Sequence, residues 1–120
     1  MTDTDVSVDE VASQLESRLM SQGLYVTELT FADGTYHLEY ESVAAEQGAI
    51  PHRELGRVIN LFRELHPDDW TGADIEAVVT DFEGEPKGTW QVAQEWLAAL
   101  ETGDLSEVEF SERVVETLSR

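Results

Sequence analysis

The chain has 120 residues, of which 41% are hydrophobic, so it suits a single domain whose core needs neither disulfides nor metal. It contains no cysteine, which excludes thiol redox chemistry and cysteine-ligated zinc. Its 26 acidic residues against 7 Lys plus Arg give a formal net charge of −19, which opposes binding to a nucleic acid backbone.

The acidic residues are spread along the chain and interleaved with periodic apolar positions, which indicates an acidic surface on a folded core. Self-repulsion at −19 destabilises a compact state in dilute buffer, whereas molar salt, with a Debye length of about 3 Å, screens it. Apolar runs stay well short of the ~18 residues that a membrane span requires, and residues 1–9 do not resemble a signal peptide. We therefore expect a cytoplasmic protein of a salt-loving host, without a membrane partner.

The first third of the chain predicts a helix followed by a β-hairpin. Residues 1–7 are expected to be frayed, and apolar residues three or four apart predict a helix over residues 8–19, which Gly23 ends. The period then changes to two, and Asp33 and Gly34 supply the turn between two antiparallel strands.

The middle of the chain predicts a loop, a helix and a third strand. Residues 42–50 show no clear period and are expected to form a loop or a ragged extension of the second strand. Pro51 is suited to be the first residue of a helix that ends before Pro67. The β-branched residues over 75–82 predict a third strand, and the sequence leaves open whether it pairs with the first strand or the second.

Two helices are predicted for the last third of the chain. Thr89 is the expected N-cap of the first, which has Trp90 on its apolar stripe, and Gly103 is its expected left-handed C′ residue. Ser106 and Glu109 have the spacing of a capping box, which opens the second helix.

These elements predict one α+β domain over residues 1–120 with the order α-β-β-α-β-α-α. The expected three-stranded sheet consists of the antiparallel hairpin and one further strand. Helices cover it mainly on one face, and the last two form an αα-hairpin.

Signals for catalysis or metal binding are weak. The three histidines fit no H-E-x-x-H spacing, and in a chain this acidic, pairs of carboxylates arise by chance. His66 near Asp68 and Asp69 has the composition of a loop metal site, but a histidine that complements the C-terminus of a helix is the simpler interpretation. We therefore predict no catalytic residue, no metal ligand and no cofactor.

The helix predicted from Pro51 carries the candidate interaction surface. It holds three of the seven basic residues, so it is the least negative part of the chain. Its interior glycine costs ~1 kcal/mol relative to alanine, and one leucine lies off the apolar stripe. A partner would explain both residues, and so would packing against the protein's own loops. The surface consists of Arg53, Gly56, Arg57, Asn60 and Leu61.

An alternative hypothesis is a small-ligand or metal-binding protein, or a minor enzyme. Its pocket would lie between the sheet and the C-terminal helices, lined by Trp70, Trp90 and Trp96. Core packing is the other interpretation of these tryptophans, because large aromatic residues mostly supply buried area.

The residues GEPKGTW, followed by EWLAALETGDLSEVEFSERVVETL, resemble an uncharacterised family of small acidic proteins from halophilic archaea. The resemblance extends from about Pro51 to the C-terminus and implies a halophilic cytosol, with no catalytic residues to transfer. The last two helices are also similar to short helical hairpins associated with oligomerisation. We therefore expect a non-enzymatic protein-interaction module, with a homodimer as one form, that uses the Arg53 surface or an exposed sheet edge.

Overall fold

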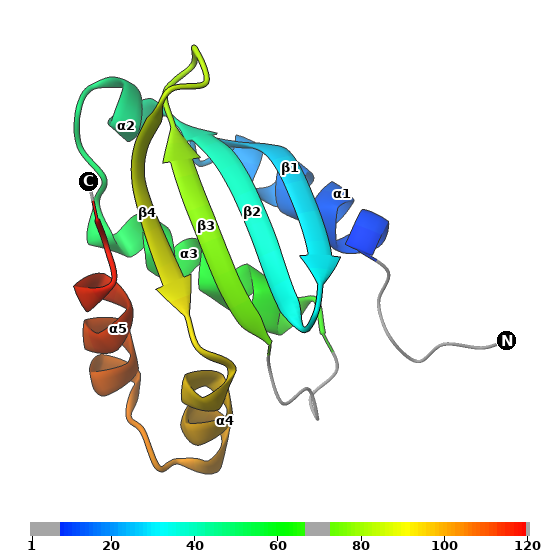
Figure 1. The fold of residues 1–120 in the computed structure, drawn as a ribbon, viewed down its shortest axis with the longest axis vertical. Coiled ribbons are helices and arrows are strands. Elements are labelled where there is room, and N and C mark those ends of the chain that lie inside the picture. Colours follow the sequence, from blue (N-terminus) through cyan, green and yellow to red (C-terminus); the bar gives the residue numbers. More distant parts are fainter. Residues whose placement is uncertain (1–7, 67–72, 120) are drawn as a thin grey trace, which may run out of the picture.

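The computed structural model describes residues 8–66 and 73–119, which form five helices and four strands. Figure 1 shows the four strands side by side, with α1 and α3 behind them. In chain order the elements are α1 (Val8–Met20), β1 (Leu24–Ala32), β2 (Thr35–Ser42), α2 (Val43–Glu46), α3 (His52–Glu64), β3 (Asp74–Thr80), β4 (Pro86–Val92), α4 (Gln94–Thr102) and α5 (Glu107–Glu116).

The first helix and the hairpin are confirmed. Asp33 and Gly34 both have positive φ angles, 53° and 79°, as a two-residue turn with the twist of antiparallel strands requires. The predicted loop over residues 42–50 contains one short helix, α2, which Ser42 caps by accepting a hydrogen bond from the backbone N–H of Ala45.

The predicted three-stranded sheet is wrong, because residues 86–92 form a fourth strand instead of the start of a helix. Trp90 and Val92 are buried, whereas the preceding Thr89 and the intervening Gln91 are exposed, so the segment has a period of two. Trp90 also falls on the apolar stripe of the helix predicted to begin at Thr89. Pairing with β3 decides between the two conformations, because it satisfies the backbone groups along an edge of β3 that a helix would leave unpaired.

The helix boundary moves accordingly. Helix α4 follows Ala93, which provides no side-chain cap, so the expected N-cap at Thr89 is wrong. The carboxylate of Asp74, at the start of β3, accepts the backbone N–H of Gln94 at 2.7 Å and takes over that role. The left-handed Gly103, with a φ of 86°, and the capping box of Ser106 with Glu109 are both confirmed.

The sheet has the order β1-β2-β3-β4 and is mixed. The two hairpins, β1–β2 and β3–β4, are antiparallel, while the central pair β2–β3 is parallel. This settles the pairing of the third strand, which lies beside the second. Helix α3 makes the crossover between β2 and β3 that a parallel pair requires.

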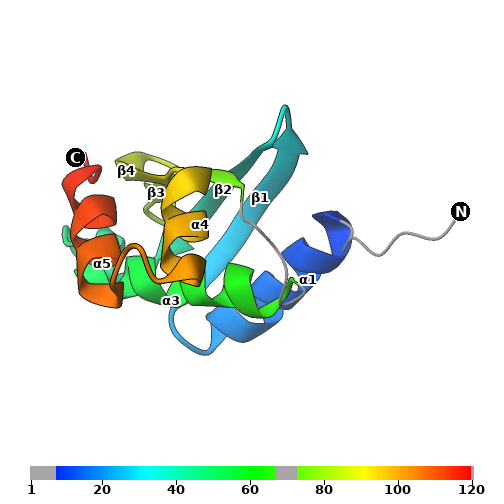
Figure 2. The ribbon, with the colours of Figure 1, turned by 90° about the horizontal axis from the view of Figure 1, so that it is seen from below.

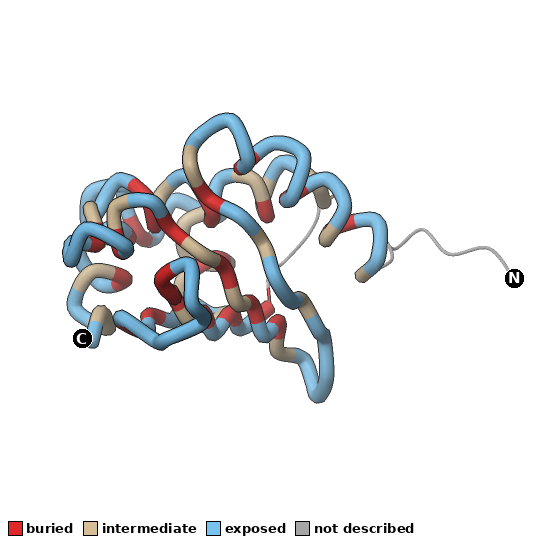
Figure 3. Tube along the Cα trace, turned by 90° about the horizontal axis from the view of Figure 1, so that it is seen from above, coloured by how far each residue is buried: buried red, intermediate tan, exposed pale blue. Residues whose placement is uncertain are grey.

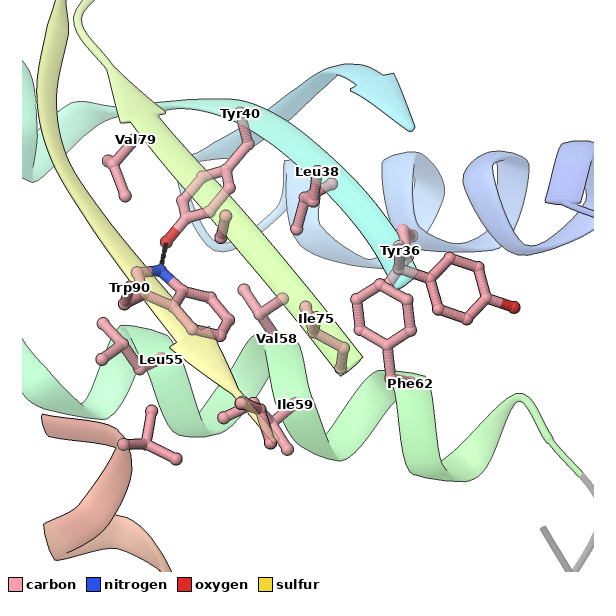
Figure 4. Packing of buried hydrophobic residues seen from close by; sticks show 14 of the residues in the cluster. Tyr36, Leu38, Tyr40, Leu55, Val58, Ile59, Phe62, Ile75, Val79 and Trp90 are labelled. Atoms are coloured by element: carbon pink, nitrogen blue, oxygen red, sulfur yellow. Dashed lines mark hydrogen bonds between the residues drawn. The ribbon is translucent and has the colours of Figure 1, made fainter. Parts of the chain in front are cut away.

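Helices α1 and α3 lie on one side of the sheet, as Figure 2 shows, and α5 packs against both α3 and β4. Every second residue of β2, from Tyr36 to Ser42, and of β4, from Gly88 to Val92, is buried, and Figure 3 shows where buried and exposed positions lie along the chain. The buried side of β2 presents Tyr36, Leu38 and Tyr40 to α3, where Phe62 packs against Tyr36 with ring centroids 5.0 Å apart (Figure 4). The opposite side of the sheet carries polar residues such as His37.

The two edges of the sheet differ. The backbone of Thr89 in β4 exchanges two hydrogen bonds of 2.8 Å with Ser119, which continues the ladder by one bridge. The hydroxyl of Thr117 also accepts the N–H of Gln91. Strand β1 forms the other edge, with β2 as its neighbour in the sheet.

Candidate functional site

The N-terminal half of α3 lies between two hollows in the protein surface. One hollow, the α3–α5 groove, has a volume of about 260 Å³, and the other, the α2–α3 hollow, about 280 Å³. Arg53 lines both. The two hollows therefore form neighbouring parts of one candidate site on α3.

The α3–α5 groove has an apolar floor and a polar rim. Core residues of both helices form its floor, and Gly56 leaves it open, because a Cβ atom at that position would meet nothing within 4 Å. The groove is lined by His52, Arg53, Leu55, Gly56, Ile59, Asn60, Glu107, Phe110, Ser111, Val114 and Val115.

The α2–α3 hollow is more polar. It lies where the turn between α1 and β1, helix α2 and the first turns of α3 meet. It is lined by Gln22, Gly23, Leu24, Ser42, Val43, Ala44, Gln47, Pro51, Arg53, Glu54 and Arg57.

A buried hydrogen-bond network lies at the base of this hollow. Glu54 is 6% exposed, and its two carboxyl oxygens accept hydrogen bonds from the Ser42 hydroxyl at 2.8 Å and from the Tyr40 hydroxyl at 3.2 Å. The indole N–H of Trp90 donates to the Tyr40 oxygen at 3.0 Å (Figure 4). Each polar side chain of this network thus has a partner, as burial requires.

Burial sets the protonation behaviour of this network. It raises the pKa of the Glu54 carboxyl above its ordinary value of 4.5, while the hydrogen bonds from Ser42 and Tyr40 act in the opposite direction. It also raises the pKa of Tyr40, which the nearby Glu54 raises further. The network therefore disfavours negative charge at the base of the hollow.

Two arginines of α3 are left without an acidic partner in the part of the chain that the structure describes. Arg18 pairs with Glu64 at 3.1 Å and Arg63 approaches Glu107 at 3.7 Å. Within residues 8–66 and 73–119, however, neither Arg53 nor Arg57 lies within 4.0 Å of a carboxylate. Both are exposed in a chain with 26 acidic residues, which makes their isolation unusual.

The structure places the five residues of the predicted interaction surface as follows. Arg53, Gly56 and Asn60 line the α3–α5 groove. Arg57 does not line this groove but lines the α2–α3 hollow. Leu61 lies half-buried against the core, which explains why it interrupts the polar face of the helix. The open space beside Gly56 shows that no close backbone contact within the described residues requires glycine there.

The three tryptophans of the alternative pocket are separated. Trp90 is 2% exposed and belongs to the core, and Trp96 lines a different hollow, between α4 and α5, with Arg113 and Glu116 among its neighbours. Trp70 lies outside the described residues. Trp90 thus lines neither hollow of α3 and has a structural partner in Tyr40.

The side chain of His66 lies just past the C-terminal end of α3 and makes two contacts. Its Nδ1 lies 2.6 Å from the carbonyl oxygen of Phe62, and its Nε2 lies 2.9 Å from the Tyr36 hydroxyl. Because a carbonyl only accepts, Nδ1 is the donor in the first of these contacts. The described residues contain no cluster of three or more metal-ligating side chains, and Asp68 and Asp69 lie outside them.

The sequence interpretation missed the network around Glu54. Its signal was present in β2, where Tyr36, Leu38 and Tyr40 alternate on the buried face and Ser42 is the next residue of that face. A hydroxyl at a core-facing position needs a buried partner, and Glu54 supplies it.

These features define a small acidic α+β domain with a four-stranded mixed sheet, α1 and α3 on one face of it, and a paired set of hollows on α3. The chain belongs to a family described as a domain of unknown function, DUF8159, whose model matches residues 5–120. This match agrees with the predicted resemblance to an uncharacterised family and extends it through the N-terminal helix and hairpin. Comparisons with curated proteins and with solved structures give no match.

Among the described residues, every helix is too short or too polar to span a bilayer.

Proposed function

We propose that this protein is a non-enzymatic interaction module that binds an acidic segment of a partner protein along α3. The observation that carries the proposal is the isolation of Arg53 and Arg57 from the carboxylates of the described residues, in a chain with a net charge of −19. Arginine forms bidentate hydrogen bonds with carboxylates, so two guanidinium groups that find no carboxylate among the described residues are suited to a partner's Asp or Glu side chains.

The groove next to Arg53 supplies the apolar part of the contact. Its floor includes Leu55, Ile59 and Phe110, and the missing side chain at Gly56 gives room for one large apolar residue of the partner. Burial of such an anchor in a pocket commonly dominates binding energy, with charged contacts at the rim fixing orientation. The expected binding segment therefore combines a large apolar residue with acidic neighbours.

We further propose that the module works in a cytosol of high ionic strength, in a halophilic host. The net charge of −19 and the sequence resemblance support this. Salt at molar concentration screens long-range attraction, with a Debye length of about 3 Å, so recognition must rely on direct ion pairs and apolar burial. The combination of arginines and an apolar groove on α3 meets that requirement.

A library of random peptides displayed on phage, selected on the immobilised protein in molar KCl, tests the proposal. We expect enrichment of peptides with a large apolar residue beside Asp or Glu. The double change R53E and R57E should abolish it, and Gly56→Leu, which fills the groove, should weaken it.

A matched control separates recognition from a general charge effect. The double change K87E and R113E alters the net charge by the same amount, away from both hollows of α3. Enrichment that is lost equally in both double variants, or that favours basic peptides, would contradict the proposal.

The edge of β1, which pairs with no further strand among residues 8–66 and 73–119, favours a second candidate, a homodimer that pairs two copies edge to edge. The nine-residue strand contains one charged residue, Glu28, and no Pro or Lys, the residues that usually protect an edge. The other edge of the sheet is bridged by Ser119. Light scattering in molar KCl should then give the mass of a dimer, whereas a monomer at every protein concentration would eliminate this candidate.

A further inference from the structure

The α2–α3 hollow has a composition that differs from that of the groove beside it. Its charged groups are Arg53, Arg57 and Glu54, and the remaining lining residues are polar amides, one hydroxyl and small or apolar residues. These three groups contribute a local charge of +1 when Glu54 is ionised, in a molecule of −19. The hollow is therefore a positive site in an otherwise negative protein.

Hydrogen-bond donors surround the opening without partners inside the described protein. The side chains of Gln22 and Gln47 form no hydrogen bond with residues 8–66 or 73–119, and Arg53 and Arg57 form no ion pair there. The two guanidinium groups and two amides come from three different parts of the chain, namely the α1–β1 turn, the end of α2 and α3. Their convergence on one hollow suits a ligand with several acceptor oxygens.

The base of the hollow does not compete for these donors. Both oxygens of Glu54 already accept hydrogen bonds, from Ser42 and from Tyr40, and only 6% of the residue is exposed. Leu24, which also belongs to the core, and Val43 add apolar surface to the lining. A ligand with an anionic end and a small apolar body complements this arrangement.

We propose that the α2–α3 hollow binds a small organic carboxylate, whose oxygens Arg53 and Arg57 hold while its apolar part lies against Leu24 and Val43. The volume of about 280 Å³ suits a ligand of the size of a small metabolite. A carboxylate, with one negative charge, balances the local +1 better than a phosphate dianion does. The site shares Arg53 and Arg57 with the proposed partner contact but differs from it in the remaining lining, because Gln22 and Gln47 do not line the α3–α5 groove.

Binding also has an expected pH dependence. The ionisable side chains that line the hollow are Arg53, Arg57 and Glu54. Protonation of Glu54, whose pKa burial raises, removes the one negative charge among them. Carboxylate affinity should therefore increase as the pH falls through the range in which Glu54 takes up its proton, as long as the ligand itself stays ionised.

A nuclear magnetic resonance titration of the full chain tests the site, with isovalerate and benzoate as probes and inorganic phosphate and acetate as comparisons, all in molar KCl. We expect saturable shifts of backbone amides in residues 22–24, 43–47 and 53–57 with the two apolar carboxylates. Acetate should bind more weakly because it lacks the apolar body. Because chloride is present at the same molar concentration in every titration, non-specific anion binding contributes equally to all of them and does not account for differences between the probes.

Two variants locate the ligand. Arg57→Gln should weaken isovalerate binding by about tenfold, the loss typical of one charge-assisted hydrogen bond. Gly56→Leu, which fills the neighbouring groove, should leave binding unchanged and so separates this site from the peptide site. No saturable shift, equal binding in wild type and Arg57→Gln, or a response to phosphate alone would overturn the proposal.

Discussion

Glu54 shows how one residue connects the core of this protein to its surface. Its carboxyl group links Ser42 and Tyr40 inside the protein, while its neighbours Arg53 and Leu55 belong to the surface and the core, respectively. A buried carboxyl that keeps both hydrogen bonds is tolerated, but its ionised form is destabilised by desolvation. The stability of the whole domain should therefore depend on the charge of this residue.

The pH dependence of stability follows from the sign of the shift. In the folded state the pKa of Glu54 is raised above its ordinary value of 4.5, so the folded protein holds this proton more tightly than the unfolded chain does. The stabilising contribution of protonated Glu54 is complete below pH 4.5 and is lost as the pH rises through the folded-state pKa. Above that pKa the contribution is absent, and the free energy of unfolding no longer changes with pH on account of Glu54.

Glu54→Gln tests this dependence, because glutamine has a similar shape and no titration. The free energy of unfolding of the wild type minus that of the variant should decrease from pH 4.5 upwards and then become constant. Urea unfolding in molar KCl, repeated across the pH range, measures this difference. A difference that does not change with pH would show that Glu54 titrates alike in both states.

Residue patterns predict part of the site and miss the rest. Arg53 and Arg57 stand out in the sequence because its 7 basic residues are far outnumbered by 26 acidic ones, and the structure places both beside hollows. Glu54 is hidden among many acidic residues, because its role depends on contacts with Tyr40 and Ser42, which precede it by 14 and 12 residues. Long-range contacts of this kind leave little trace in local periodicity.

At the scale of elements, boundaries with local signals are predicted correctly and the fourth strand is not. The Asp33-Gly34 turn, the left-handed Gly103 and the capping box at Ser106 each depend on residues close in sequence. By contrast, residues 86–92 contain Trp90, which fits a helical stripe as well as a strand face, and only the partner strand β3 decides between the two conformations.

The β1 strand gives a second example of a long-range effect. A bulge between Val26 and Glu28 shifts its register against β2. Val26 therefore lies partly buried on the core side, while Tyr25, grouped by strict alternation with Leu29 and Phe31, is 37% exposed and packs edge-on against Phe82. A period of two carries no information about such an inserted residue.

Two glycines in helical surroundings should respond in opposite ways to alanine. Gly56 lies inside α3, where an added methyl group would meet nothing within 4 Å, so Gly56→Ala should raise the free energy of unfolding by about 1 kcal/mol. Gly103 has a φ of 86°, where a side chain is strained, so Gly103→Ala should lower it by about 1 kcal/mol. Urea unfolding of both variants under the same conditions checks the pair, and destabilisation by Gly56→Ala would reveal a tight contact that the structure does not contain.

At the scale of the whole molecule, charge should control stability. With a net charge of −19, compaction brings many carboxylates together, and added salt relieves that repulsion. The urea midpoint at neutral pH should therefore rise steadily from dilute buffer to molar KCl. At about pH 4 the rise should be smaller, because many carboxylates are then protonated. The same salt response at both pH values would indicate a cause other than charge.

The parallel pairing of β2 with β3 has a consequence for how the chain folds. Each hairpin closes through a short turn, whereas β2 and β3 meet only after the chain between Ser42 and Asp74 has looped back with α3. Closing that loop costs entropy before any contact compensates for it, so the central pair should form last and limit the folding rate. The middle of the sheet, buried most deeply in the finished structure, is then the line along which two locally formed halves join.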